Sequence, residues 1–334
     1  MVRTRHVTAV EQARPADVPP PRKRGKGEGA PRRAFTPTWR SLLIFLSPAL
    51  VLYTLFIIYP LFSVLQYSMF RWNGPQRLGF AGLSNFVDLF TRYPINQQMF
   101  AAFWHNCAFF AGTMLVQNTV GLAFAVLLYR SRFGKRFLQT AYTLPHLVSP
   151  IVVGYLWSLM LSPTFGVVNA GLRAVGLEQL AMPWLGDPNT ALPVVILVKA
   201  WQWIGFPMLL FSAALAGIPE EYDQAARVDG ANSWQRFRRV TLPLLVPAMG
   251  LVGVLTFIDS FNVFGVVFAL EGKMGAPAGA TDVLGLLFYR TAFFSYAPNH
   301  IGLSSALAVL MFVFIFGTSM LANRYLRKWE ARLK

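Results

Sequence analysis

Residues 41–70 read SLLIFLSPALVLYTLFIIYPLFSVLQYSMF, and no charged side chain occurs between Arg40 and Arg71. A helix needs about 20 mainly apolar residues to cross the hydrocarbon core of a membrane, which is roughly 30 Å thick. The apolar core of a cleavable signal peptide is shorter than this stretch. We therefore predict a membrane-spanning helix near residues 42–66.

Five further stretches of low charge follow along the chain. They are 93–129, 137–172, 188–219 with Lys199 as its one charge, 240–270 with Asp259 as its one charge, and 291–323. Each has room for one spanning helix, and the predicted spans lie near 104–129, 138–162, 192–216, 243–269 and 302–323. The alternative is a soluble protein with buried helices, but such helices rarely exceed about 20 residues. The pattern predicts an all-α polytopic membrane protein with about six transmembrane helices.

The composition supports this class and excludes several others. Of 334 residues, 55% are hydrophobic and 13% are charged, whereas soluble domains have about 25% charged residues. The single cysteine, Cys107, permits no intramolecular disulfide, and the four histidines lack the spacing of metal ligands, so we expect no metal site. Gly134-Lys135 is followed by Arg136, so the sequence shows no P-loop. We expect a chain that is not an enzyme, with no ATPase motif and no cofactor.

Basic residues are concentrated in the segments 1–40, 130–136, 220–239 and 324–334, which hold 23 of the 30 Lys and Arg residues. Cytoplasmic segments of membrane proteins are enriched in Lys and Arg, which predicts that both termini lie in the cytoplasm. The uneven distribution argues against nucleic acid as a partner, since a nucleic-acid-binding domain carries its charge on one folded surface.

Three regions follow from this pattern: a basic tail at 1–40, a transmembrane permease domain at 41–323, and a short basic tail at 324–334. The first tail is rich in Pro, Gly and Arg, and we expect it to be disordered. It serves either as a signal for membrane topology or as a segment attracted to anionic lipid.

The segment 218–239 interrupts the apolar pattern with the sequence IPEEYDQAARVDGANSWQRFRR. Pro219 is typical of a first helical turn, Gly230 of a left-handed helix end, and Asn232 or Ser233 of a second helix start. The pattern predicts a helix–turn–helix element. We expect its apolar side to be formed by Tyr222, Ala225, Ala226, Trp234 and Phe237. Two interpretations remain open, an amphipathic element on the membrane surface and a docking site for a cytoplasmic partner.

The same segment resembles the "EAA" loop of binding-protein-dependent ABC importer permeases. The matching residues are Gln224-Ala225-Ala226, Asp229-Gly230-Ala231 and the downstream Leu242-Pro243-Leu244 with Pro247. The family has Glu at the position of Gln224. Segments similar to those of sugar permeases are Gly82-Leu83-Ser84-Asn85-Phe86, Gly275-Ala276-Pro277 with Thr281, and Tyr289-Arg290 with Ala292-Phe293. The chain thus resembles the first permease of a maltose- or glycerol-3-phosphate-type importer.

This resemblance implies a type I ABC importer permease fold in the bacterial cytoplasmic membrane and the import of a sugar or sugar derivative. It implies three partners besides the lipid bilayer: a second permease in a heterodimer, a dimeric ATPase that uses the ATP, and an extracytoplasmic solute-binding protein. The residues implied to couple the permease to the ATPase are Gln224, Ala225, Ala226, Asp229, Gly230 and Ala231. ATPase closure would then tilt the helices between inward-open and outward-open states.

The two charges inside predicted spans, Lys199 and Asp259, are candidates for the substrate path. A carboxylate at the centre of a spanning helix costs about 2.5–3.5 kcal/mol, so it should face protein or water. The predicted orientation puts both charges in the outer half of the membrane, where we expect them to approach each other. The alternatives are that Lys199 snorkels to the outer interface and that Asp259 forms a purely structural salt bridge.

Aromatic and amide side chains near these charges extend the candidate path, because sugars stack on aromatic rings and bond to amides. They are Trp201, Trp203, Phe261 and Asn262. Trp is also common at membrane interfaces, which is the simpler explanation for each Trp alone.

Other functions remain in view. A permease for another small solute, such as an amino acid or phosphate, is the alternative within the importer class, and a secondary transporter is the alternative from a different class. Secondary transporters typically show inverted repeats, interrupted spans and ion sites inside the membrane. The sequence shows no clear repeat and one carboxylate within the predicted spans.

Overall fold

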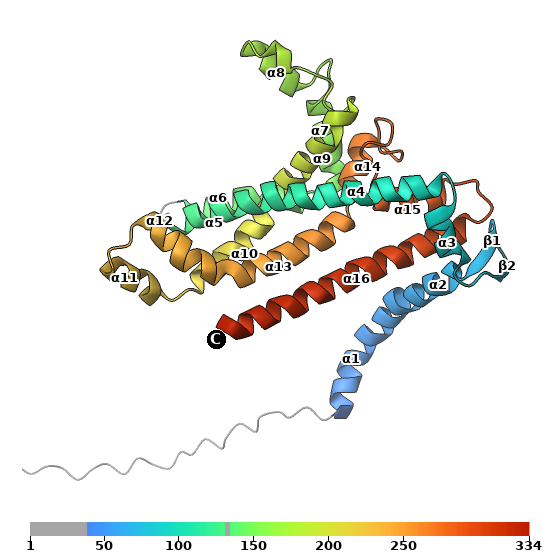
Figure 1. The fold of residues 1–334 in the computed structure, drawn as a ribbon, viewed down its shortest axis with the longest axis horizontal. Coiled ribbons are helices and arrows are strands. Elements are labelled where there is room, and N and C mark those ends of the chain that lie inside the picture. The colour runs from blue at the N-terminus through green and yellow to red at the C-terminus, as the bar shows by residue number, and fades with distance from the viewer. Residues whose placement is uncertain (1–38, 131–133, 334) are drawn as a thin grey trace, which may run out of the picture. The chain divides into compact units, whose positions relative to one another are not determined.

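A computed structural model describes residues 39–130 and 134–333. The predicted disordered tail at 1–40 therefore lies almost entirely outside the described residues, as do part of the basic loop at 130–136 and residue 334. Within the described part the chain is helical, as expected for the all-α class, apart from one two-stranded hairpin. Figure 1 shows the elements in chain order.

The elements of the first half are α1 (Trp39–Tyr53), η1 (Thr54–Ile58), α2 (Tyr59–Ser68), β1 (Phe70–Asn73), β2 (Gln76–Phe80), α3 (Ser84–Thr91), α4 (Ile95–Thr113), η2 (Met114–Asn118), α5 (Thr119–Arg130), α6 (Lys135–Leu147), α7 (Pro150–Met160) and α8 (Val167–Ala174). The later elements are η3 (Glu178–Leu180), α9 (Pro188–Trp203), α10 (Gly205–Ala216), α11 (Glu220–Val228), α12 (Ser233–Arg236), η4 (Phe237–Thr241), α13 (Leu242–Phe261), α14 (Gly265–Glu271), α15 (Leu284–Phe293) and α16 (His300–Leu333). The chain divides into two units, 1–55 and 56–334, and the packing described below belongs to the second.

Within residues 39–130 and 134–333, four helical stretches are long and apolar enough to cross a membrane. They are Leu42–Ser68, Ile95–Tyr129, Ser233–Phe261 and His300–Lys328, which correspond to the predicted first, second, fifth and sixth spans. Two bent pairs, α6 with α7 and α9 with α10, raise the number to six if each pair is counted as one span.

The prediction of one continuous helix at 138–162 is wrong. α6 and α7 meet at 95°, and the break falls at Val148 and Ser149, directly before Pro150. The proline ring excludes the preceding residue from the helical conformation, and Ser149 has φ −53° and ψ 133°. Pro150 then begins the next helix, where its missing N–H would have no intrahelical partner.

The predicted fourth span, 192–216, is also bent, by 46° between α9 and α10. Pro207 lacks the amide hydrogen that would continue the helix ladder across the bend. Gly205 lies so close to α6 that an added Cβ would be 2.4 Å from the carbonyl oxygen of Tyr142. The small residue therefore allows the two helices to touch at this point.

The predicted fifth span, 243–269, ends early. α13 stops at Phe261, and the chain becomes helical again only at Gly265. Phe264 has φ −148° and ψ −63°, outside the helical region. The last predicted residues of this span therefore form the separate helix α14, which packs on α7.

α13 packs between α4 and α16 (Figure 1), and α10 packs along α5. The buried side chain of Asn106 in α4 joins this bundle to its neighbours. Its Nδ2 donates to the Ser260 carbonyl at 2.8 Å, and its Oδ1 accepts from the Leu284 N–H at 2.9 Å. One satisfied amide thus connects α4 to the end of α13 and the start of α15.

The hairpin β1–β2 and the short helices α3, α8 and α15 were not predicted from the sequence. Asn85 at the start of α3 is fully buried, and its Nδ2 donates to the carbonyls of Ser68 at 2.7 Å and Phe70 at 2.9 Å. Its Oδ1 accepts from Asn299 Nδ2 at 2.7 Å. A Cβ on Gly302 would lie within 2.8 Å of all three of Asn299, Asn85 and Phe70. This junction seats the hairpin on α2 and α16.

Candidate functional site

The segment 218–239 forms two helices joined by a tight turn, as predicted. α11 begins after Pro219, and Glu220, Glu221 and Asp223 lie in its first turn. These carboxylates complement the positive end of the helix dipole. The polar sequence therefore specifies the helix start without help from apolar packing.

α11 ends in a Schellman motif. Gly230 has φ 77°, its N–H bonds to the Arg227 carbonyl, and the Ala231 N–H bonds to the Ala226 carbonyl, both at 3.0 Å. Residues with a Cβ rarely adopt this backbone conformation. The predicted left-handed stop at Gly230 is confirmed.

The second helix begins with a capping box. The Asn232 side chain accepts from the Gln235 N–H, and the Gln235 side chain accepts from the Asn232 N–H, both at 2.9 Å. Of the two predicted caps, Asn232 and Ser233, the structure selects Asn232. Because both helix ends are capped, the turn is a defined corner.

Asp223 bonds to two arginines of this element. Its carboxylate oxygens accept from Arg236 Nη1 at 2.7 and 2.8 Å, and Oδ2 also accepts from Arg227 Nε at 2.9 Å. The sequence reasoning missed both pairs. The spacing of four residues between Asp223 and Arg227 is a signal that could have indicated that pair. The pair of Asp223 with Arg236 could not be found in this way, because it forms only when the turn brings α12 next to α11.

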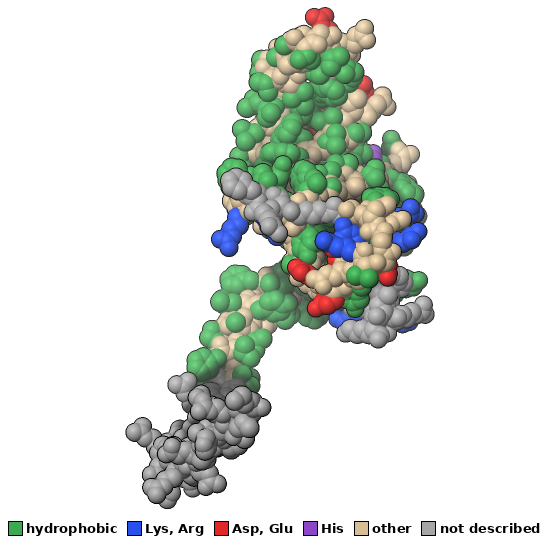
Figure 2. All heavy atoms as spheres, turned by 90° about the vertical axis from the view of Figure 1, so that its left-hand side faces the viewer, with side chains coloured by type: hydrophobic (Ala, Val, Ile, Leu, Met, Phe, Trp, Pro, Cys, Tyr) green, Lys and Arg blue, Asp and Glu red, His purple; other side chains and the backbone are tan. Residues whose placement is uncertain are grey.

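Apolar side chains of the element face outward. Val228 is 88% exposed, Trp234 65% and Tyr222 53%. Ala225 is exposed as well, while Ala226 and Phe237 are half-buried. Figure 2 looks onto the end of the molecule that carries α11 and α12, and charged side chains gather there.

Of the residues that the resemblance assigns to coupling, Gln224, Ala225 and Ala226 lie within α11, and Asp229, Gly230 and Ala231 form the corner. The Asp229 N–H bonds to the Ala225 carbonyl at 3.0 Å, one step before the Schellman bonds of Gly230 and Ala231. Gln224 lines a cavity on the inner side of α11. The backbone groups of Ala225, Ala226, Asp229, Gly230 and Ala231 thus fix the end of α11.

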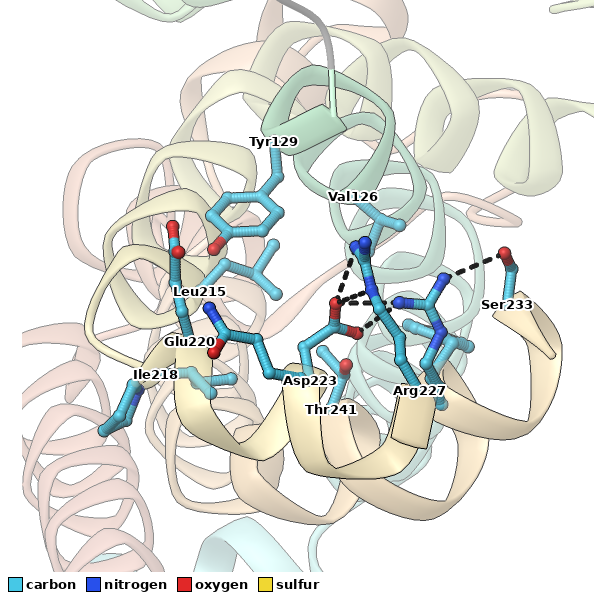
Figure 3. Close-up of a pocket in the computed structure, with 13 residues that line it drawn as sticks. Val126, Tyr129, Leu215, Ile218, Glu220, Asp223, Arg227, Ser233 and Thr241 are labelled. Carbon is cyan, nitrogen blue, oxygen red and sulfur yellow. Dashed lines mark hydrogen bonds and ion pairs between the residues drawn. The ribbon is translucent and has the colours of Figure 1, made fainter. Parts of the chain in front are cut away.

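The cavity has a volume of about 440 Å³ and lies between this element and the ends of α5 and α10. Val126 and Tyr129 of α5 and Leu215 of α10 line one side, and Glu220 and Asp223 of α11 line the other (Figure 3). α11 is therefore separated from the bundle by open space along part of its inner face.

The second candidate site is the pair of charges within the spans. Lys199 Nζ in α9 lies 3.0 and 3.1 Å from the two carboxylate oxygens of Asp259 in α13. The Lys199 side chain is 5% exposed and that of Asp259 26%. The expectation that the two charges approach each other is confirmed, and snorkelling of Lys199 to the interface is excluded.

An aromatic side chain completes this pair. Lys199 Nζ lies 3.9 Å from the centroid of the Trp203 ring, one helical turn further along α9. The Trp203 ring also meets the His146 ring of α6 edge-on, at 4.3 Å between centroids. The structure thus brings Trp203, one of the predicted path residues, to the Lys199 side of the charged pair.

The other predicted path residues lie elsewhere. Trp201 is 45% exposed and contacts the ring of Trp157. Phe261 is buried against Phe103 and Phe314. Asn262 donates to the carbonyl of Ile258 and lines a separate apolar groove with α16. The ring contacts and hydrogen bonds of these three residues do not include Lys199 or Asp259, so the compact site consists of Lys199, Asp259 and Trp203.

Gln202 lies between Trp201 and Trp203 in α9 and has a structural role that the sequence reasoning did not identify. It is fully buried, and its Nε2 donates to the Val148 carbonyl at 2.9 Å. That carbonyl lies at the break between α6 and α7, where the helix ladder cannot satisfy it. An amide inside an apolar run is the signal that could have pointed to this role.

The segment 272–283, between α14 and α15, is held by a buried ion pair. Arg290 Nη2 lies 2.7 Å from Asp282 Oδ2, and the Thr281 hydroxyl donates to the Ala276 carbonyl at 2.7 Å. Burial raises the pKa of Asp282 in spite of Arg290, and burial raises the pKa of Glu271 at the end of α14 to about 8.

In the described residues, no group of three or more His, Cys, Asp and Glu side chains is placed to hold a metal ion.

Comparison with known proteins agrees with this architecture. Residues 117–330 match the family model described as "binding-protein-dependent transport system inner membrane component". The chain is 30% identical over 294 residues to the probable starch degradation products transport system permease protein AmyD of Thermoanaerobacterium thermosulfurigenes, covering 87% of this chain and 95% of that protein. It is also 30% identical to the trehalose/maltose transport system permease protein MalF of Thermococcus litoralis, covering 80% and 87%.

The fold also matches a solved structure. A chain of a bacterial ABC transporter involved in the import of the acidic polysaccharide alginate superposes with a TM-score of 0.72 at 25% identity, covering 86% of this chain and 95% of that one. The expected importer permease fold is therefore confirmed. With the family model matching most of the chain, this multi-pass protein belongs to the family of binding-protein-dependent transport system inner membrane components.

Proposed function

We propose that this chain is the permease subunit of an ATP-driven importer that moves a sugar or sugar derivative across the cytoplasmic membrane. The observation that carries the proposal is the capped element 218–239. Its corner is fixed by a Schellman motif and a capping box, and it presents Tyr222, Val228 and Trp234 outward. A rigid element with exposed aromatic and aliphatic side chains suits docking to a protein partner.

The partner proposed for this element is a dimeric ATPase, which would supply the ATP hydrolysis. The family's dependence on a binding protein supports an extracytoplasmic solute-binding protein as a second partner, and a second permease in a heterodimer would complete the pathway. The termini and the element 218–239 would then share the cytoplasmic side, in agreement with the Lys and Arg distribution.

Sugar as the substrate is supported by the names of the two relatives, which refer to starch degradation products and to trehalose and maltose. The compact site offers a carboxylate acceptor, an ammonium donor and an indole ring within a few ångströms. Hydroxyl groups of a sugar can bond to the first two groups and its C–H face can stack on the third. Lys199 is already neutralised by Asp259, which disfavours a phosphate ion as the substrate.

The test is uptake by the complete importer in proteoliposomes. Radiolabelled maltose, trehalose, phosphate and a mixture of amino acids are supplied separately with ATP on the cytoplasmic side. We expect ATP-dependent uptake of a sugar and none of phosphate. Uptake of phosphate or an amino acid alone would contradict the sugar assignment. Sugar uptake that persists without the ATPase subunit and follows an ion gradient would contradict the importer mechanism.

A further inference from the structure

The bonds between Asp223 and Arg236 join α11 to α12, whereas the other side-chain hydrogen bonds of the element stay within one helix or its cap. Arg236 Nη1 lies between the two oxygens of Asp223, at 2.7 and 2.8 Å. The Arg236 side chain is 15% exposed. A charge-assisted bond to a largely buried guanidinium is stronger than a bond between exposed neutral groups.

We infer that Asp223 and Arg236 are positioning residues that make α11 and α12 transmit movement as one body. The inference rests on the proposed docking role of the element 218–239. A partner that pushes on α11 would move the start of α13 only if the angle between α11 and α12 is fixed. α12 continues through η4 into α13 without a break, so this one ionic link connects the docking helix to a spanning helix.

The cavity beside α11 is the reason that the bond between Asp223 and Arg236 is needed. The cavity of about 440 Å³ leaves part of the inner face of α11 unsupported by α5 and α10. The corner is fixed at its backbone by Gly230 and Asn232, but a two-helix corner can still hinge about the residues between its caps. A bond from the first turn of α11 to the last residue of α12 resists that motion at a distance from the corner.

The resemblance to the family sharpens this role. Gln224 lies at the position where the family has Glu, and its amide carries no charge. The carboxylate that pairs with Arg236 is supplied by Asp223, one residue earlier. In this chain the ionic link of the element therefore does not depend on the family's acidic position.

Arg227 provides a matched comparison for the test. It bonds to the same carboxylate and carries the same charge, but it lies on α11 itself, four residues from Asp223, and its side chain is 66% exposed. Arg227→Gln removes an exposed ion pair within one helix, and such a pair contributes little to stability. Arg236→Gln removes the pair between helices. The two variants therefore separate loss of charge from loss of the link.

The experiment uses the complete importer with the variants Arg236→Gln, Arg236→Lys and Arg227→Gln. Uptake of a mixture of radiolabelled maltose and trehalose is measured together with ATP hydrolysis, and hydrogen–deuterium exchange is measured over residues 219–231. We expect Arg236→Gln to lower sugar imported per ATP hydrolysed at least threefold and to speed exchange in α11. Arg227→Gln should cause less than half of that change, and Arg236→Lys should recover at least half of the loss.

Two results would overturn the inference. The first is an equal effect of Arg236→Gln and Arg227→Gln on sugar imported per ATP, which would reduce the link to local charge. The second is unchanged exchange of α11 in Arg236→Gln. Failure of the wild-type importer to take up either sugar would instead count against the proposed substrate, and the exchange measurement would still decide the link.

Discussion

Lys199 Nζ lies 3.0 Å from Asp259 Oδ2, so the one charge of α9 and the one charge of α13 compensate each other between two helices. Removing one partner of such a pair leaves the other without a counter-charge and costs about 3–5 kcal/mol when the site is buried. Because Lys199 is the less exposed of the two, losing Asp259 should be more harmful than losing Lys199.

We therefore expect Asp259→Asn to reduce the amount of assembled importer more than Lys199→Met, as measured by size-exclusion chromatography of the purified complex. The double variant Lys199→Met with Asp259→Leu should recover assembly, since no unpaired charge remains. If the pair also contacts the sugar, uptake by the double variant should stay below a tenth of the wild-type rate. Recovery of both assembly and uptake would show a purely structural salt bridge.

Gly230→Val should uncouple transport while leaving the protein in the membrane. Nothing lies within 4 Å of an added Cβ, so the substitution causes no clash. Its cost is backbone strain, because a β-branched residue held at φ 77° is strained by about 1–3 kcal/mol. The strain would open the corner between α11 and α12. We expect ATP-dependent uptake to fall at least tenfold at equal membrane content on immunoblots.

The control for this variant is Gly176→Val at the end of α8. Gly176 has φ 78° and open space around it, and its N–H and that of Leu177 make the same Schellman pattern as at the end of α11. The strain is thus matched and only the location differs. Uptake should remain within twofold of wild type, and an equal loss in both variants would refute a special role for the corner at Gly230.

Asn85→Ala should destabilise the assembled protein without a specific effect on coupling. The change removes three hydrogen bonds of a fully buried amide and leaves the carbonyls of Ser68 and Phe70 without this donor. Each unsatisfied buried group costs about 1–3 kcal/mol. We expect the thermal midpoint in detergent to fall by roughly 5–10 °C. Asn299→Ala should lower the thermal midpoint less in the Asn85→Ala variant than in the wild-type protein, because the two side chains bond to each other.

Glu271 should make stability depend on pH. Burial raises its pKa to about 8 in the folded protein, so the folded state holds a proton that the unfolded chain releases near pH 4.5. The contribution of protonated Glu271 to the free energy of unfolding is therefore fully present below pH 4.5. It decreases as the pH rises toward 8. Glu271→Gln should raise the thermal midpoint at pH 8.5 and leave it unchanged at pH 4.5. Equal midpoint shifts at both pH values would contradict this assignment.

The spans could be predicted because the thickness of the hydrocarbon core sets the length that a spanning helix needs, and the sequence shows which stretches are apolar over that length. The breaks within them could be predicted only in part. Pro150 marks the corner between α6 and α7 in the sequence, because a proline excludes the preceding residue from the helical conformation. The gap before Gly265 has no proline, and Gly265 packs against Pro150 of another helix. Such a break depends on tertiary contacts that a local pattern does not contain.

The candidate sites follow the same rule. The caps at Gly230 and Asn232 were predictable because a Schellman motif and a capping box each involve residues within a few positions of one another. The Asp223–Arg236 pair joins residues 13 positions apart and depends on the geometry of the turn between them. Lys199 and Asp259 were paired correctly because each is the one charge in its apolar run. The burial of Phe261 against Phe103 and Phe314 could not be predicted. The sequence does not show which face of the helix meets the neighbouring helices.

The junction of Asn85, Asn299 and Gly302 also has a consequence for biogenesis. Asn85 and Asn299 are separated by 214 positions, so the ribosome delivers Asn85 long before its partner emerges. During insertion of the intervening helices, the hairpin β1–β2 lacks its seat on α16. The nascent protein therefore acquires this closure only when the last helix enters the membrane, and a chain truncated before residue 299 would present an incomplete fold to the quality-control proteases of the cell.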